Sequence, residues 1–161
     1  MNNLFLFIII YPFILVQAGT VQLIIENPCE AKKTFKSNII YNDNLELSAG
    51  IATFDPLSKS NVSYIGDESG MNSIYHSPIG KEAIYQDKKN TVYAFGWCYS
   101  VNNIAPDMMP NETKLDLTIP LNTILWWFGS AISKNGEWIE YCKALSTQPN
   151  KIRKEMCSRF K

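Results

Sequence analysis

Four cysteines and a single histidine are the residues of this chain with the most reactive chemistry: Cys29, His76, Cys98, Cys142 and Cys157. In an oxidising compartment the four thiols are expected to form two disulfides. The alternative is a nucleophilic cysteine served by the histidine, but no flanking residues of the right type would activate a thiolate. A zinc site is disfavoured because there is one histidine and no CxxC spacing. The cysteines therefore predict disulfides, with no catalytic residue, metal site or cofactor.

Three disulfide connectivities are possible, and we favour Cys98–Cys142 together with Cys29–Cys157. The first two cysteines lie on predicted strands at the two ends of one aromatic segment, whereas the other two lie in the extensions before and after it. Closing the long loop of the second pair contributes about 4–5 kcal/mol in the chain-entropy description.

The N-terminal segment predicts export. Leu4–Val16 is a run of thirteen apolar residues, which suits the core of a secretory signal and is shorter than the roughly 20 residues that span a bilayer. Val16 and Ala18 supply small residues at −3 and −1, so we expect a signal peptide over 1–18. The alternative is an uncleaved anchor, and the segment before Leu4 carries no Lys or Arg. We expect a secreted or periplasmic protein with no stable membrane insertion after cleavage.

The overall charge is balanced, because the chain contains 15 basic and 15 acidic residues. Such a chain has no global field that attracts nucleic acid or an anionic membrane. The exception is Lys151–Lys161, where five positive residues accompany only Glu155. A solvated helix face is the preferred interpretation of this segment, and contact with a membrane or nucleic acid is the alternative. We therefore expect a monomer that binds no nucleic acid.

The mature chain reads as strand-rich with short helices. Runs of β-branched and aromatic residues predict strands at Val21–Glu26, Thr34–Tyr41, within Asn61–Tyr75, and at Tyr93–Val101, Lys114–Ile119 and Ile124–Phe128. The apolar positions of Leu45–Phe54 fit one face of a short helix, and His76–Asn90 is loop-like. After Pro149, an apolar residue recurs every fourth position at Ile152, Met156 and Phe160, which predicts a last helix.

The segment Phe95–Cys142 holds all four tryptophans and is the predicted rigid part of the domain. Large and small residues alternate from Tyr93 to Val101, so one strand face is bulky and the other permits close packing. The continuous apolar run Ile124–Phe128 predicts a central strand covered on both faces. Asn135-Gly136 predicts a type I′ hairpin that pairs Ile132 with Ile139.

Most of these aromatic side chains are expected to form the core, and a ligand platform is the alternative. The members beside turns are the ones that we expect to be exposed. They define a predicted contact surface, made of the turn after the aromatic strand and the neighbouring hairpin: Tyr99, Asn102, Asn103, Ile104 and Trp138.

Three short motifs resemble the transcobalamin-like C-terminal domain family: Ser73-Ile74, Trp97–Asn102 and Ile124–Trp126. Two positions depart from the family pattern, since Asn103 replaces the turn glycine and Asn122 replaces an acidic residue. The resemblance covers about Val21–Cys142. It implies an α+β, β-grasp-like fold, with mostly antiparallel twisted sheets packed on one short helix, here followed by a C-terminal helical extension. In transcobalamins this domain closes over cobalamin held by a separate helical domain, which this chain lacks, so cobalamin binding does not carry over.

These observations divide the chain into a signal peptide at 1–18, an α+β domain at 19–142 and a helical extension at 143–161. We expect a non-catalytic, exported binding module whose partner is a protein or a small ligand. The alternatives are a small secreted enzyme or enzyme inhibitor, and a structural or adhesive protein. An enzyme would need a free cysteine, or a cleft in which His76 meets an acid such as Asp67 or Glu68.

Overall fold

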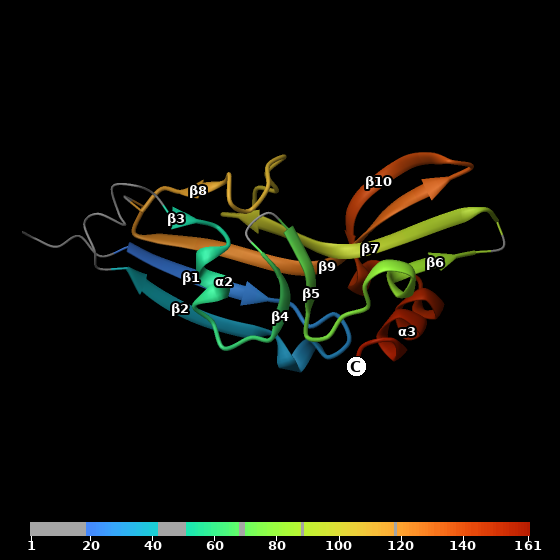
Figure 1. Ribbon diagram of the computed structural model, residues 1–161, viewed down its shortest axis with the longest axis horizontal. Coiled ribbons are helices and arrows are strands. Elements are labelled where there is room, and N and C mark those ends of the chain that lie inside the picture. The colour runs from blue at the N-terminus through green and yellow to red at the C-terminus, as the bar shows by residue number, and fades with distance from the viewer. Residues whose placement is uncertain (1–18, 42–50, 68–69, 88, 118) are drawn as a thin grey trace, which may run out of the picture.

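The computed structural model describes residues 19–41, 51–67, 70–87, 89–117 and 119–161 (Figure 1). The predicted signal peptide lies outside the described residues. The described part is strand-rich and contains two α-helices, α2 (Asp55–Ser58) and α3 (Asn150–Ser158). Three 3₁₀ turns accompany them, η1 (Ala31–Lys33), η2 (Gly80–Ala83) and η3 (Leu145–Thr147). The mixed α and β class predicted from the sequence is therefore confirmed.

One curled sheet organises the molecule, with the strand order β2-β1-β9-β7-β6 and with β10 added beside β9 (Figure 1). Its strands are β1 (Gly19–Ile25), β2 (Phe35–Tyr41), β6 (Ile84–Gln86), β7 (Thr91–Val101), β9 (Leu121–Lys134) and β10 (Glu137–Ala144). Two small sheets pair β3 (Ile51–Ala52) with β8 (Lys114–Leu115), and β4 (Tyr64–Asp67) with β5 (Gly70–Ile74).

Strand β9 is the longest, at 14 residues, and contacts three others. Strand β7 lies antiparallel along one edge, from Val101 opposite Ile124 to Thr91 opposite Lys134. The other edge is shared: β1 pairs with its first half in parallel, and β10 pairs with its second half. The β1–β9 pair is the one parallel ladder among the described strands, so the expectation of a mostly antiparallel sheet is confirmed.

Alternate side chains of β1 and of the first half of β9 are buried, which gives this part of the sheet one core face. Val21, Leu23 and Ile25 of β1 are 0% exposed. They form the first core with Ile124 and Trp126 of β9, and with apolar residues of α2, β3, β5 and β8 that cover this end of the sheet: Leu57, Ile51, Ile74 and Leu115.

A second core lies under α3. Ile152 and Met156 of the helix are buried, as their fourfold spacing predicted, and half-buried Phe160 packs beside them. They contact Phe128 of β9 and Phe95 of β7. Because β9 supplies Trp126 to one core and Phe128 to the other, this strand joins the two cores.

Two disulfides tie the ends of the chain to the sheet. Cys29 is bonded to Cys157, which attaches α3 to the segment after β1, and Cys98 is bonded to Cys142, which attaches β10 to β7. This is the connectivity that we favoured from the sequence.

The structure corrects the prediction of a short helix over Leu45–Phe54. Residues 42–50 lie outside the described residues, but Ile51 and Ala52 form β3 and pair with Leu115 and Lys114. Ile51 is only 3% exposed in this pairing. A β-branched residue gains more from a buried strand position than from a helix that contains Gly50.

Two further predictions about strands are wrong in part. The run Ile124–Phe128 lies in a central strand as predicted, but its second face is only partly covered, because Leu125 and Trp127 are half-buried while their neighbours are buried. The segment His76–Asn90 is not wholly loop, because Ile84–Gln86 forms the edge strand β6 beside β7. This strand is only three residues long, too short for a periodic pattern to reveal it.

The two cores yield a prediction for stability. Leu23→Ala removes a fully buried side chain from β1, and we expect it to lower the free energy of unfolding by about 2–5 kcal/mol. Ile40→Ala is the matched control on the neighbouring strand, where the side chain is 63% exposed, and should change it by less than about 0.5 kcal/mol. Urea denaturation of both variants measures the difference, and equal effects would contradict the placement of the core.

Candidate functional site

The predicted contact residues do not come together in the structure. Asn102, Asn103 and Ile104 follow the end of β7, where Val101 lies opposite Ile124. Trp138 lies near the other end of the same ladder, opposite Ser133 of β9, which pairs with Val92 of β7 on its other side. Ten residues of extended strand, roughly 33 Å, separate the two ends. The sequence therefore singled out two surfaces rather than one.

At the turn, Asn102 has a structural role. Its Oδ1 accepts a hydrogen bond from the Thr123 amide at 2.8 Å, and its Nδ2 donates to Asn122 Oδ1 at 3.0 Å. Asn122 is 1% exposed and donates in turn to the Asp116 carbonyl at 2.8 Å. Asn102 and Asn103 both adopt positive φ, 51° and 67°, a conformation that asparagine tolerates better than most residues. Asn122 thus supports this turn through its hydrogen bonds, and Asn103 suits the conformation that the turn requires.

Tyr99 also acts mainly as a support. Its ring stacks on buried Trp126 with 5.2 Å between centroids. Its hydroxyl lies 2.6 Å from the Met108 carbonyl and 2.7 Å from Thr113 Oγ1, so it holds the loop after the turn. The apolar residues that this end does expose are Ile104, at 71%, and the methionines Met108 and Met109.

At the other end, strand β10 exposes three large apolar side chains within four residues. Trp138 is 50% exposed, Ile139 60% and Tyr141 69%. The rings of Trp138 and Tyr141 lie 6.4 Å apart between centroids at an interplanar angle of 29°. We call Trp138, Ile139 and Tyr141 the β10 patch. Such a cluster on an edge strand is a frequent mark of an interaction site.

Irregular pairing places the β10 patch on the surface. The hairpin turn forms as predicted, with positive φ at Asn135 and Gly136 and with Glu137 opposite Lys134. The register then shifts, so that Ile132 pairs with Glu140 and not with Ile139, which corrects the predicted pairing. A second shift lies between Glu140 and Lys143. Bulges add residues to one strand and increase its local twist, which turns Ile139 and Tyr141 away from the core.

Three contacts anchor the far end of β10 to the sheet. The Cys98–Cys142 bond joins it to β7, and Trp127 Nε1 donates to the Cys142 carbonyl at 2.9 Å. Gly129 permits this approach, since a Cβ there would lie 3.1 Å from the carbonyl carbon and oxygen of Cys142. Cys142 itself has φ of 54°, a conformation that costs free energy for a residue with a Cβ. The disulfide and the indole hydrogen bond hold it there.

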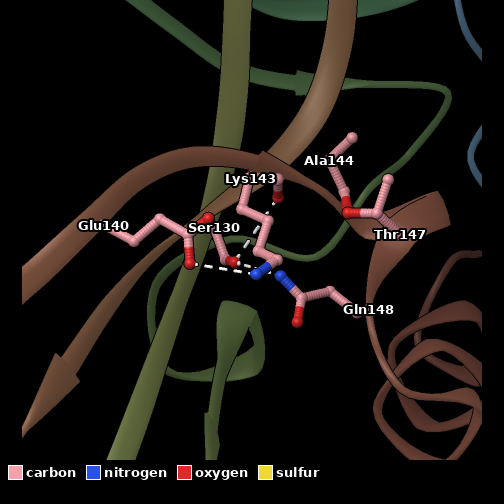
Figure 2. Close-up of polar contacts among 6 residues, drawn as sticks. All are labelled: Ser130, Glu140, Lys143, Ala144, Thr147 and Gln148. Carbon is pink, nitrogen blue, oxygen red and sulfur yellow. Dashed lines mark hydrogen bonds and ion pairs between the residues drawn. The ribbon is translucent and has the colours of Figure 1, made fainter.

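A polar cluster lies where β10 leads into η3 (Figure 2). Lys143 Nζ lies 3.0 Å from Glu140 Oε2. Ser130 is fully buried, donates to the Lys143 carbonyl at 3.5 Å and accepts a hydrogen bond from Gln148 Nε2 at 3.0 Å. These contacts fix the path of the chain from β10 toward α3.

The structure shows no assembled catalytic group among the described residues. All four cysteines are in disulfides, which removes the basis for a thiol enzyme. His76 and Glu30 line one groove of 680 Å³, but the His76 side chain forms no hydrogen bond or ion pair with a described residue. Glu30 pairs with Lys33 at 2.7 Å instead. Glu68, one of the two acids considered as a partner for His76, lies outside the described residues.

Tyr75 lines the same groove as His76. Burial raises the pKa of its phenol, and a hydrogen bond with the Phe35 backbone partly opposes this rise. Both Tyr75 and His76 have positive φ, 56° and 55°. The neutral phenol packs edge-on against Trp97, so its contacts are those of a core residue.

Comparison with known proteins gives no family: no family model, no curated protein and no solved structure matches this chain. Within the described part of the chain, no three side chains of the metal-binding types gather as a metal site would require. The described helices are all too short or too polar to cross a membrane.

The anchoring of β10 can be tested with a pair of glycines that face each other across β7 and β9. Gly129→Ala places a methyl group against the Cys142 backbone, and we expect it to lower the free energy of unfolding by about 1–3 kcal/mol. Gly96→Ala is the control, because a Cβ there meets no atom within 4 Å. Thermal or urea unfolding measures both variants, and an unperturbed Gly129→Ala protein would show that β10 is not held as described.

Proposed function

We propose that this protein is an exported, non-catalytic binding module and that the β10 patch is its contact surface for another protein. The exposed Trp138 and Tyr141 rings are the observation that carries the proposal. Tryptophan and tyrosine dominate the binding energy of protein interfaces, because each buries a large area at a small cost in side-chain entropy. The two disulfides fit an oxidising compartment outside the cytosol.

The surroundings of the patch favour a protein partner. Glu137, Glu140 and Lys143 flank the three apolar side chains along the same strand, as charged residues surround the apolar centre of many interfaces. Charges on an edge strand also oppose uncontrolled strand pairing. The other edge of β10 pairs with no described strand, so a partner can approach from that side.

The finer description of the fold belongs to the same proposal. We infer a β-grasp-like domain of the transcobalamin C-terminal type, in which the sheet curls over helical elements. The motifs that carry this resemblance lie in elements of the first core: Ser73-Ile74 ends β5, Trp97–Val101 ends β7, and Ile124–Trp126 lies in β9. A domain of this type has no enzymatic role of its own here.

The experiment compares proteins captured from the secretions of the source cells by the immobilised chain and by Trp138→Ala/Tyr141→Ala. We expect at least one partner whose retention falls about tenfold or more, the usual cost of removing an interface hot spot. Both side chains are exposed, so stability should change little.

The matched control is Ile65→Ala/Ile104→Ala, which removes two other exposed apolar side chains, 55% and 71% exposed. It should capture the same partner as the unaltered chain. If the β10 variant retains every protein that the unaltered chain retains, in equal amount, the patch is not the contact surface.

A further inference from the structure

Two shallow grooves meet along the seam between α3 and β6, where the C-terminal helix packs beside the edge of the sheet (Figure 1). Their volumes are 480 and 640 Å³, and they share the side chains of Ile84 and Arg159. They adjoin at these two residues, and we call the two grooves together the α3 seam. None of the residues of the β10 patch lines it.

Arg159 fixes the two walls of the α3 seam. Its Nη1 donates to the backbone carbonyls of Glu82 at 2.7 Å and Ile84 at 2.8 Å. Its Nη2 donates to Glu155 Oε1 at 2.7 Å. One guanidinium thus joins the end of the helix to η2 and β6, so the seam has a preformed shape.

The carboxylates of the α3 seam are already engaged. Glu155 pairs with Arg159, and Glu82 pairs with Lys161 at 3.5 Å. Asp87 accepts hydrogen bonds from the backbone amides of Lys89 at 2.8 Å and Thr91 at 2.9 Å. The hydrogen bond from the Thr91 amide, and to a smaller extent that from the Lys89 amide, keeps the pKa of Asp87 below its usual value. The Asp87 carboxylate therefore stays ionised and bound within its own turn.

The cations that remain are three exposed lysines along the α3 seam, Lys81, Lys89 and Lys151. None of them forms an ion pair with a described residue. They come from three separate parts of the chain: η2, the turn between β6 and β7, and the first turn of α3. Asp87 interacts electrostatically with Lys89, but the lining of the two grooves holds five basic residues and three acidic ones, so the seam is positive although the whole chain is neutral.

Two tyrosines form part of the floor between these lysines. The rings of Tyr85 and Tyr93 meet edge to face, with 5.8 Å between centroids. Tyr85 is 8% exposed, whereas Tyr93 is half-buried and presents part of its ring to the groove. Burial, and then the nearby charge of Asp87, raises the pKa of Tyr93, so this phenol stays neutral and can donate a hydrogen bond.

We propose that the α3 seam binds a linear acidic polysaccharide, with Lys81, Lys89 and Lys151 contacting its sulfate or carboxylate groups and Tyr93 packing against a sugar ring. Cations from three separate parts of the chain, along two adjoining grooves, suit a chain that carries one negative group at each of several successive sugars. A phenol ring offers both an apolar face and a polar edge, as a sugar does. A flat bilayer does not enter a concave seam. This inference goes beyond the proposed protein contact and does not depend on it.

The test measures binding of a heparin octasaccharide to the full chain by isothermal titration calorimetry at low and at physiological salt. Lys81→Gln/Lys89→Gln/Lys151→Gln removes the three cations of the seam, and we expect affinity to fall by about tenfold or more. The control Lys32→Gln/Lys36→Gln/Lys114→Gln makes the same change in net charge at exposed lysines elsewhere, and should bind within about twofold of the unaltered chain. Affinity should also fall as salt is raised.

Three results would overturn the proposal. They are the absence of measurable binding by the unaltered chain, equal losses in the two triple variants, and tighter binding of a single-stranded oligonucleotide or of vesicles with anionic lipid than of the octasaccharide. Tyr93→Leu keeps the apolar volume but removes the ring, so it should weaken binding severalfold, and unchanged binding would exclude the stacking contact. Trp138→Ala should leave glycan affinity unchanged, which separates this test from that of the β10 patch.

Discussion

The structure depends on one strand, β9, whose two edges and one buried face are all used. Its first half pairs with β1 and its second half with β10, while β7 follows it throughout. Side chains from its buried face enter both cores, Trp126 the first and Phe128 the second. A shift of one residue in its register would move this whole set to the opposite face. The positions of α3, β10 and the first core are therefore coupled through a single ladder, and the C-terminal segment belongs to the folded unit through its contact with Phe128.

This arrangement leaves β10 free on its outer edge yet firmly held at its base. The disulfide to Cys98, the close approach at Gly129 and the indole hydrogen bond from Trp127 all act near Cys142. Toward the hairpin turn, Trp138 is exposed within the regular ladder and the bulges direct Ile139 and Tyr141 outward, where charged neighbours flank them. A rigid aromatic surface loses little side-chain entropy when it binds. That combination is the basis for our proposal that the β10 patch contacts another protein.

Features encoded over a few residues could be predicted from the sequence, and features that depend on distant pairing could not. The Asn135-Gly136 turn, the apolar stripe of α3 and the cysteine connectivity each follow from local chemistry or from position along the chain. The parallel pairing of β1 with β9 joins segments about a hundred residues apart, and no local pattern specifies it. Ile139 was assigned an inward pairing because alternation assumes a regular ladder, and the bulge breaks that assumption. Trp138 was found by its place beside a turn. Tyr141 and the α3 seam were not predicted, the first because its exposure depends on the bulges of β10 and the second because β6 is so short.

Amide hydrogen exchange under native conditions tests most directly whether β9 joins the two cores into one cooperative unit. The account predicts that the most protected amides of β1, of β9 from Ile124 to Phe128, and of α3 around Met156 exchange with the same free energy, equal to that of global unfolding. The account would be contradicted if the amides of α3 and of Phe128 opened with a clearly lower free energy than those of β1 and Ile124. The second core would then unfold while the first remained intact.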